Sequence, residues 1–128
     1  MEMRLELVPV PVSNVDKAKA FYVDQVGFEE SVDVVVQEGM RVVQLTPPGS
    51  GCSIVMGTGM PEISDMVPGS QKALHLVVSD IEAARTELMA RGVDVAEIQD
   101  MGGVLFGYFA DPDGNSWLLQ QFPSDVTA

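Results

Sequence analysis

The sequence offers few side chains that could carry out chemistry. It contains one histidine, His75, and one cysteine, Cys52, among 128 residues. Histidine is the usual acid or base near neutral pH and also hydrogen-bonds polar ligands, so His75 is the only candidate catalytic residue. Cys52 has no neighbouring base or cation in the sequence that would activate its thiol, and we expect it to be a small buried residue. One cysteine makes no intrachain disulfide and no metal cluster.

Two other stretches resemble binding loops only superficially. Residues 57–69, "GTGMPEISDMVPG", contain glycines but lack the spacing and the following helix of a phosphate loop. Residues 111–114, "DPDG", match the start of a calcium loop, but the later ligands are missing. A tight turn explains this motif.

Composition restricts the classes of partner. The chain is 46% hydrophobic and 20% charged, which predicts one globular domain. It has no apolar run long enough to span a membrane and no signal-peptide pattern at its start, so we expect a cytoplasmic protein. A net charge of −12 argues against nucleic acid and membrane surfaces as partners. The charge is compatible with a cationic ligand, or it only keeps the protein soluble.

An internal repeat organises the chain. "VSNVDKAKA" from Val12 matches "VSDIEAART" from Val78 at a constant offset of 66 residues. Both stretches predict helices that begin with a capping box, formed by Ser13 with Asp16 and by Ser79 with Glu82. Apolar residues follow at helical spacing, and a glycine suited to a left-handed C-cap ends each stretch at Gly27 and Gly92.

Strand-like segments surround both helices. One apolar run precedes each helix and three follow it, including "VDVAEI", "VLFGYF" and "SWLLQQF" in the second half. We therefore predict an α+β fold of two βαβββ modules, about residues 1–57 and 72–123, joined by a connector at 58–71. Helices on the outer face of a curved mixed sheet would leave the other face uncovered, as a curved wall. We expect the other module, a second chain or a ligand to cover it.

The paired modules, the stretch "VSNVDKAKAFYVDQVGF" and the turn in "FADPDGNSWLLQQ" resemble the vicinal oxygen chelate superfamily. This superfamily contains glyoxalase I, extradiol dioxygenases, fosfomycin-resistance enzymes and bleomycin-binding proteins, and the chain is most similar to a bacterial glyoxalase-like branch. The resemblance implies the βαβββ fold. It also implies a homodimer, because relatives that sequester antibiotics often bind them in clefts shared by two chains.

The resemblance also allows the metal site of the superfamily to be tested position by position. Metal-using members place one His, Gln or Glu ligand in each of four strands, facing the curved wall. The corresponding positions here are Leu7, Ala73, Leu118 and either Ile54 or Val55. None of these side chains donates a lone pair to a cation. We therefore expect no metal and no other cofactor, and an apolar pocket in place of the metal site.

Alternation along the strands adds a second tier to this pocket. His75 lies two residues after Ala73, and Gln120 lies two residues after Leu118. Pro9 is the residue that corresponds to His75 in the first repeat. Either His75 and Gln120 hydrogen-bond a ligand, or His75 is a half-buried residue satisfied by backbone or water. Aromatic side chains could supply flat walls, but alternation does not decide whether Phe106 and Tyr108 point toward the pocket or away from it. The predicted ligand-binding residues are Leu7, Pro9, Val55, Ala73, His75, Trp117, Leu118 and Gln120.

Three functions follow as hypotheses. The leading one is a metal-free protein of glyoxalase/bleomycin-resistance type that binds an apolar or aromatic small molecule. Its role would be to sequester an antibiotic or metabolite. The alternative is a lyase, isomerase or dioxygenase that uses an unrecognised metal site or the imidazole of His75. The third is a protein–protein interaction or accessory role, which a filled cavity would favour.

Overall fold

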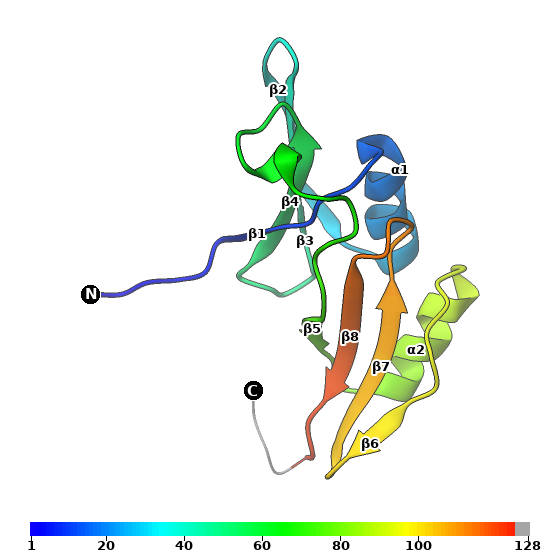
Figure 1. Cartoon of the computed structure of the whole chain (residues 1–128). Coiled ribbons are helices and arrows are strands. Elements are labelled where there is room, and N and C mark those ends of the chain that lie inside the picture. The colour runs from blue at the N-terminus through cyan, green and yellow to red at the C-terminus, as the bar shows by residue number, and fades with distance from the viewer. Residues whose placement is uncertain (125–128) are drawn as a thin grey trace.

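Each half of the chain forms one four-stranded mixed sheet in the computed structural model, which describes residues 1–124 (Figure 1). Sheet A has the strand order β1-β4-β3-β2, and sheet B has the order β5-β8-β7-β6. The strands of sheet A are β1 (Leu7–Pro9), β2 (Glu29–Gln37), β3 (Met40–Thr46) and β4 (Ser53–Thr58). Those of sheet B are β5 (Leu74–Val77), β6 (Gln99–Met101), β7 (Val104–Ala110) and β8 (Ser116–Gln121). In each sheet the first strand pairs in parallel with the last, and the other pairs are antiparallel.

One helix follows the first strand of each sheet. Helix α1 (Val15–Ala20) continues into the π-helical segment η1 (Phe21–Val26), and α2 (Ile81–Ala90) takes the equivalent place after β5. A short 3-10 turn, η2 (Ile63–Asp65), lies in the connector between β4 and β5. The order strand, helix, three strands thus occurs twice, which confirms the predicted α+β fold of two βαβββ modules. We call β1 to β4 module 1 and β5 to β8 module 2.

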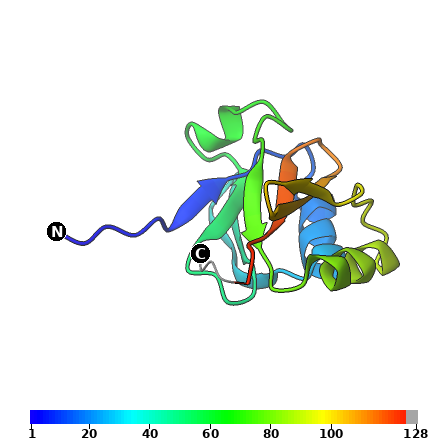
Figure 2. The same ribbon diagram turned by 90° about the horizontal axis from the view of Figure 1, so that it is seen from below.

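Both helices lie on the same side of the sheets (Figure 2). Beneath them the two modules share one hydrophobic core, in which Tyr22 and Phe28 of module 1 contact Trp117 of module 2. We call the opposite sheet surface, which points away from the helices, the open face. The N-terminal segment projects on the open side in both views (Figures 1 and 2).

The helix caps differ from those predicted. The N-cap residues are Asn14 and Asp80, whose side-chain oxygens accept hydrogen bonds from Lys17 N and Ala83 N, each at 3.0 Å. The predicted capping boxes at Ser13 and Ser79 are therefore wrong by one residue. The Ser13 hydroxyl instead donates to Asp113, 100 positions away, at 2.6 Å. The left-handed glycines are confirmed at Gly27 and Gly92, with φ of 99° and 88°.

Residues 93–98, predicted as a strand, form no regular strand. The side chains of Val93 and Val95 are buried in the core, but Val95 O and Ala96 O both accept a hydrogen bond from Arg85 Nε, at 3.1 and 3.0 Å. These carbonyls are therefore turned toward α2, and Ala96 N keeps one bond to Tyr108 O. Regular pairing with β7 begins only at β6.

The DPDGN turn ties the two modules together. The buried Asp111 carboxylate accepts hydrogen bonds from the backbone N–H of Asp113 and Asn115, and from the Tyr22 hydroxyl at 2.7 Å. Asn115 Nδ2 donates to the same carboxylate and to Pro11 O. Because Tyr22 and Pro11 belong to module 1, the turn acts as an intramolecular clamp. Burial, together with the neighbouring Asp111 charge, raises the pKa of Tyr22 above its ordinary value.

No helix within residues 1–124 combines the length and apolar character needed to cross a membrane.

Candidate functional site

The strand register decides which predicted site residues share a face in module 2. His75 on β5 lies opposite Leu118 on β8, which in turn lies opposite Tyr108 on β7. The next row on the same face consists of Val77, Gln120 and Phe106. Their strand neighbours, among them Leu76, Leu119 and Phe109, pack into the core beneath the helices.

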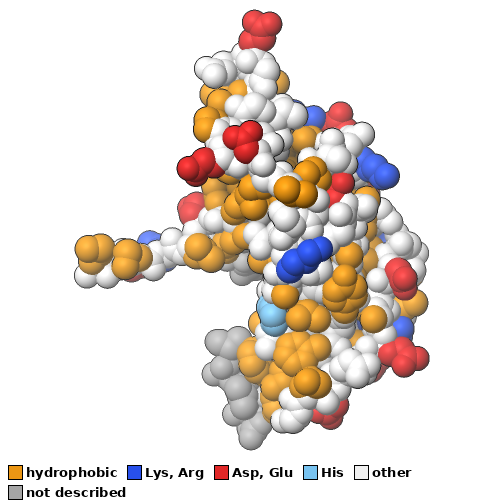
Figure 3. All heavy atoms as spheres, viewed as in Figure 1, with side chains coloured by type: hydrophobic (Ala, Val, Ile, Leu, Met, Phe, Trp, Pro, Cys, Tyr) orange, Lys and Arg blue, Asp and Glu red, His pale blue; other side chains and the backbone are white. Residues whose placement is uncertain are grey.

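Phe106 and Tyr108 therefore lie on the open face. Strand alternation alone does not decide the orientation of these two side chains. The Phe106 ring meets the His75 ring edge-on, with centroids 6.0 Å apart. Tyr108 is 50% exposed and Val77 is 53% exposed. In Figure 3, hydrophobic side chains gather around the histidine on this side of the molecule. The sequence does not show which face of sheet B the helices cover, so it does not predict which strand residues are exposed.

Module 1 has the equivalent strand register, but Val55 at its centre is only 2% exposed. Pro9 on β1 lies opposite Val55 on β4, which lies opposite Gln44 on β3. Ile54 instead belongs to the core cluster. The residue of β4 that occupies the open-face register is therefore Val55. Leu7, two residues before Pro9 on β1, has the same orientation.

Two predicted site residues have other positions. Trp117 is 2% exposed and lies on the helix side of sheet B, where its indole Nε1 donates to the Tyr22 hydroxyl at 2.9 Å. Trp117 therefore does not stand beside Leu118 on the open face, because consecutive strand residues point in opposite directions. Ala73 lies just before β5 in the left-handed region, with φ of 59°. Its carbonyl, rather than its side chain, contacts His75.

That carbonyl fixes the chemistry of the histidine. His75 Nδ1 lies 2.7 Å from Ala73 O. Because a carbonyl oxygen only accepts, Nδ1 is the donor in this contact, and Nε2 makes no hydrogen bond within residues 1–124. Gln120, one row away, makes no side-chain hydrogen bond within the described residues, so its amide has both donors and an acceptor available. Together they can bind a polar group on a ligand.

The donor set does not fit the divalent metal that the superfamily uses. The residues that the resemblance assigns to the four ligand positions are Leu7, Val55, Ala73 and Leu118, and hydrocarbon side chains hold no hard cation. Across residues 1–124, no group of three or more His, Cys, Asp and Glu side chains is arranged to hold an ion. Cys52 is half-buried, and within residues 1–124 its Sγ makes one hydrogen bond, to the neighbouring Ser53 carbonyl, at 3.7 Å.

Comparison with solved structures identifies relatives that cover nearly the whole chain. The antibiotic binding protein TnmS3 from Streptomyces sp. CB03234 is 36% identical, with a TM-score of 0.83 over 96% of this chain and 98% of that one. A glyoxalase/bleomycin resistance protein from the same strain is 37% identical, with a TM-score of 0.78 over 92% and 100%. A superfamily member from Sphaerobacter thermophilus DSM 20745 is 30% identical, with a TM-score of 0.81 over 94% and 98%.

A search of curated proteins gave no match. The sequence does match a family model, described as Glyoxalase/Bleomycin resistance protein/Dioxygenase superfamily, over residues 4–119. This match includes both modules and the DPDGN turn, and the structural relatives agree with it at 30–37% identity. The chain therefore belongs to the glyoxalase/bleomycin resistance protein/dioxygenase superfamily.

Proposed function

We propose that the protein binds a small, planar, mainly apolar molecule of antibiotic type on the open face of its sheets, without a metal ion. The observation that carries this proposal is the row of apolar and aromatic side chains that the open face exposes in the middle of a sheet. Tyr108 and Val77 are about half exposed beside Phe106 and Leu118. A contiguous exposed patch of this kind in a soluble domain is typical of a binding surface.

His75 and Gln120 would orient the ligand. With Nδ1 donating to Ala73 O, the neutral tautomer of His75 would offer Nε2 as an acceptor, and the matching ligand group would be a hydroxyl or an N–H. The Gln120 amide, one row away, offers both hydrogen-bond donors and an acceptor. The net charge of −12 favours a ligand with a cationic substituent over an anionic one. The similarity to an antibiotic binding protein supports the same class of ligand.

A second copy of the chain would cover the open face. Apolar side chains are exposed on both sheets, including Val34 on sheet A and Tyr108 on sheet B. Val34 shares the orientation of Val55, because Val34 pairs with Val42 and Val42 pairs with Gly57, two residues from Val55. Covering both surfaces would exclude water from the ligand and strengthen its hydrogen bonds.

Catalysis by His75 has less support. Within residues 1–124 its imidazole bonds only the main chain, and no carboxylate orients it as a general base. Binding therefore accounts for the geometry better than acid–base chemistry does.

Doxorubicin is a suitable first probe, because it is a fluorescent, planar aromatic antibiotic with one amine cation. We expect saturable binding by fluorescence titration. Tyr108→Ala, which removes one aromatic contact, should raise the dissociation constant about threefold to tenfold.

Val67→Ala is the matched control, because Val67 is an exposed apolar residue of the connector. It should leave doxorubicin affinity unchanged. Absence of saturable binding, or equal effects of the two substitutions, would contradict the proposal.

A further inference from the structure

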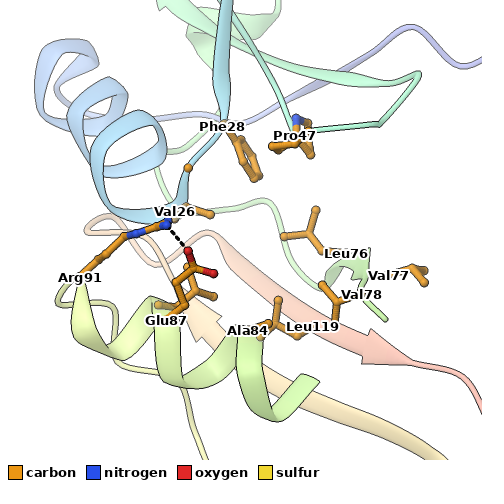
Figure 4. A pocket seen from close by; sticks show the side chains of 13 residues that line it. Val26, Phe28, Pro47, Leu76, Val77, Val78, Ala84, Glu87, Arg91 and Leu119 are labelled. Atoms are coloured by element: carbon orange, nitrogen blue, oxygen red, sulfur yellow. Dashed lines mark hydrogen bonds and ion pairs between the residues drawn. The ribbon is translucent and has the colours of Figure 1, made fainter. Parts of the chain in front are cut away.

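A cavity of about 340 Å³ lies between the two modules on the helix side of the sheets (Figure 4). We call it the junction cavity. Module 1 contributes the end of η1, the first residues after it and the turn after β3, whereas module 2 contributes β5, α2 and β8. Its volume lies in the range of small-molecule sites, roughly 300–1,000 Å³. The labelled side chains in Figure 4 surround the space from all of these elements.

The junction cavity is separate from the open face. Phe28, Leu88 and Leu119 line it and belong to the core. Leu119 points away from the open face, on which its neighbour Leu118 lies. Among the open-face residues of module 2, only Val77, at the end of β5, also reaches the cavity. A ligand here would therefore contact a different set of side chains from one bound at His75.

Local backbone geometry leaves this space unfilled. Gly27 has φ of 99°, a conformation that side-chain-bearing residues rarely adopt, so no side chain enters from this position. A Cβ there would lie 3.0 Å from Arg91 Nη1. A half-open, mainly apolar pocket of this size is suited to a small-molecule occupant.

The polar edge of the cavity consists of one ion pair. Arg91 Nη2 bonds Glu87 Oε1 one turn earlier on α2, and Nη1 lies 3.5 Å from Gln25 O. The remaining side chains that line the cavity are apolar. The formal charge of the lining is therefore zero, in contrast to the net −12 of the whole chain. An anionic ligand would compete with Glu87, and a cationic one would compete with Arg91.

We propose that the junction cavity is a second ligand site, which takes an uncharged and mainly apolar small molecule with one carbonyl or ether oxygen. The apolar part would contact Phe28, Leu76 and Leu119. The oxygen would accept from an Arg91 N–H that is not used by Glu87, since a guanidinium carries five such donors. This assignment does not depend on binding at the open face.

Prodan tests the assignment directly, because it is an uncharged naphthalene ketone whose fluorescence shifts to the blue on leaving water. The wild-type protein should give a saturable blue shift. Ala84→Phe, which places a ring in the cavity, should raise the dissociation constant at least tenfold. Ala83→Phe adds the same ring at the next, exposed position of α2 and should change affinity less than twofold.

Arg91→Met is a second variant that leaves the cavity walls in place. It keeps an apolar stem but removes the guanidinium, and it should weaken prodan binding about tenfold through loss of one hydrogen bond to a charged group. Circular dichroism would verify the fold of each variant.

Three outcomes would overturn the assignment. One is the absence of a saturable shift with the wild-type protein, and another is an unchanged affinity in folded Ala84→Phe. The third is loss of binding in Tyr108→Ala with no loss in Ala84→Phe. This last result would place the probe on the open face and would support the proposed function while excluding the junction cavity. Loss in Ala84→Phe alone would support the second site whatever the result with doxorubicin.

Discussion

The two tyrosines of the chain show how one residue type takes different roles. Tyr22 has no exposed surface, and its hydroxyl donates to Asp111 while it accepts from the Trp117 indole. Tyr108 is half exposed on the open face. The first hydroxyl supplies one of the four hydrogen bonds to the buried Asp111 carboxylate, and it is the partner of the buried Trp117 N–H. Its role is therefore structural, whereas the role we propose for Tyr108 is contact with a ligand.

Tyr22→Phe should lower the free energy of unfolding by about 2–3 kcal/mol, because it leaves Asp111 and Trp117 each with one unmade hydrogen bond in the core. Tyr108→Phe, the matched control, should change this free energy by less than about 0.5 kcal/mol. Urea denaturation measures both. Equal effects of the two substitutions would show that the clamp contributes nothing specific.

Ion pairs connect the β2–β3 hairpin to α1. Asp33 on β2 accepts two hydrogen bonds from Arg41 on β3, at 3.0 and 2.9 Å, and one from Lys19 on α1, at 2.7 Å. Arg41 also reaches Asp16 at the start of α1. Hydrogen bonds from Arg41, and then from Lys19, hold the pKa of Asp33 well below its ordinary value. The helix and the hairpin are therefore coupled electrostatically as well as through the core.

This coupling predicts a pH dependence. The pKa of Asp33 is lower in the folded than in the unfolded state, so its stabilisation is complete above the unfolded value of about 4 and is lost as the pH falls toward the folded value. Asp33→Asn should cost about 1 kcal/mol at pH 7, because the pairs are partly exposed to solvent. The difference from wild type should shrink below about pH 4.

Urea titrations at pH 7, 5 and 3 would measure this difference. Asp94→Asn, at an exposed position that makes no ion pair within residues 1–124, is the control and should have little effect at any pH. A difference between Asp33→Asn and wild type that stayed constant down to pH 3 would exclude Asp33 as the source.

On the scale of the whole molecule, exposed apolar side chains include several on the open face and in the N-terminal segment. Met1, Met3 and Leu5 are exposed in the N-terminal segment, which projects on the side of the open face (Figure 1). Both sheets expose apolar side chains there, including Val34 and Tyr108. Exposed apolar surface of this extent in a soluble domain is typical of association surfaces. The proposed dimer accounts for it.

Sedimentation velocity should therefore give twice the 13.7 kDa mass of one chain. Val34→Asp introduces a charge on the open face of sheet A and should shift the population toward monomer. Val67→Asp changes the net charge by the same amount as Val34→Asp, but at an exposed position of the connector. It should leave the dimer intact. A wild-type protein that sedimented as a monomer at micromolar concentration would contradict the proposed dimer.

The sequence alone determined the repeated order of elements, the glycine stops at Gly27 and Gly92, and the family. These follow from local signals, because helical spacing, capping glycines and the 66-residue repeat need no knowledge of distant contacts. The apolar character of the residues that the resemblance assigns to the four ligand positions can also be read from the sequence, but their assignment stays a prediction. The sequence did not determine which residue caps each helix, since Ser13 is recruited by Asp113 from the other module.

Only the tertiary structure decided which strand residues face outward. Alternation divides β7 and β8 into two sets, but the sets are equivalent until a helix covers one of them. That choice buried Trp117 and exposed Tyr108. The junction cavity was equally absent from the sequence pattern, because its lining comes from five separate elements that meet only when the modules pack together. Local periodicity thus predicts most of the elements, with residues 93–98 as an exception, whereas contacts between the modules create the surfaces on which we propose that ligands bind.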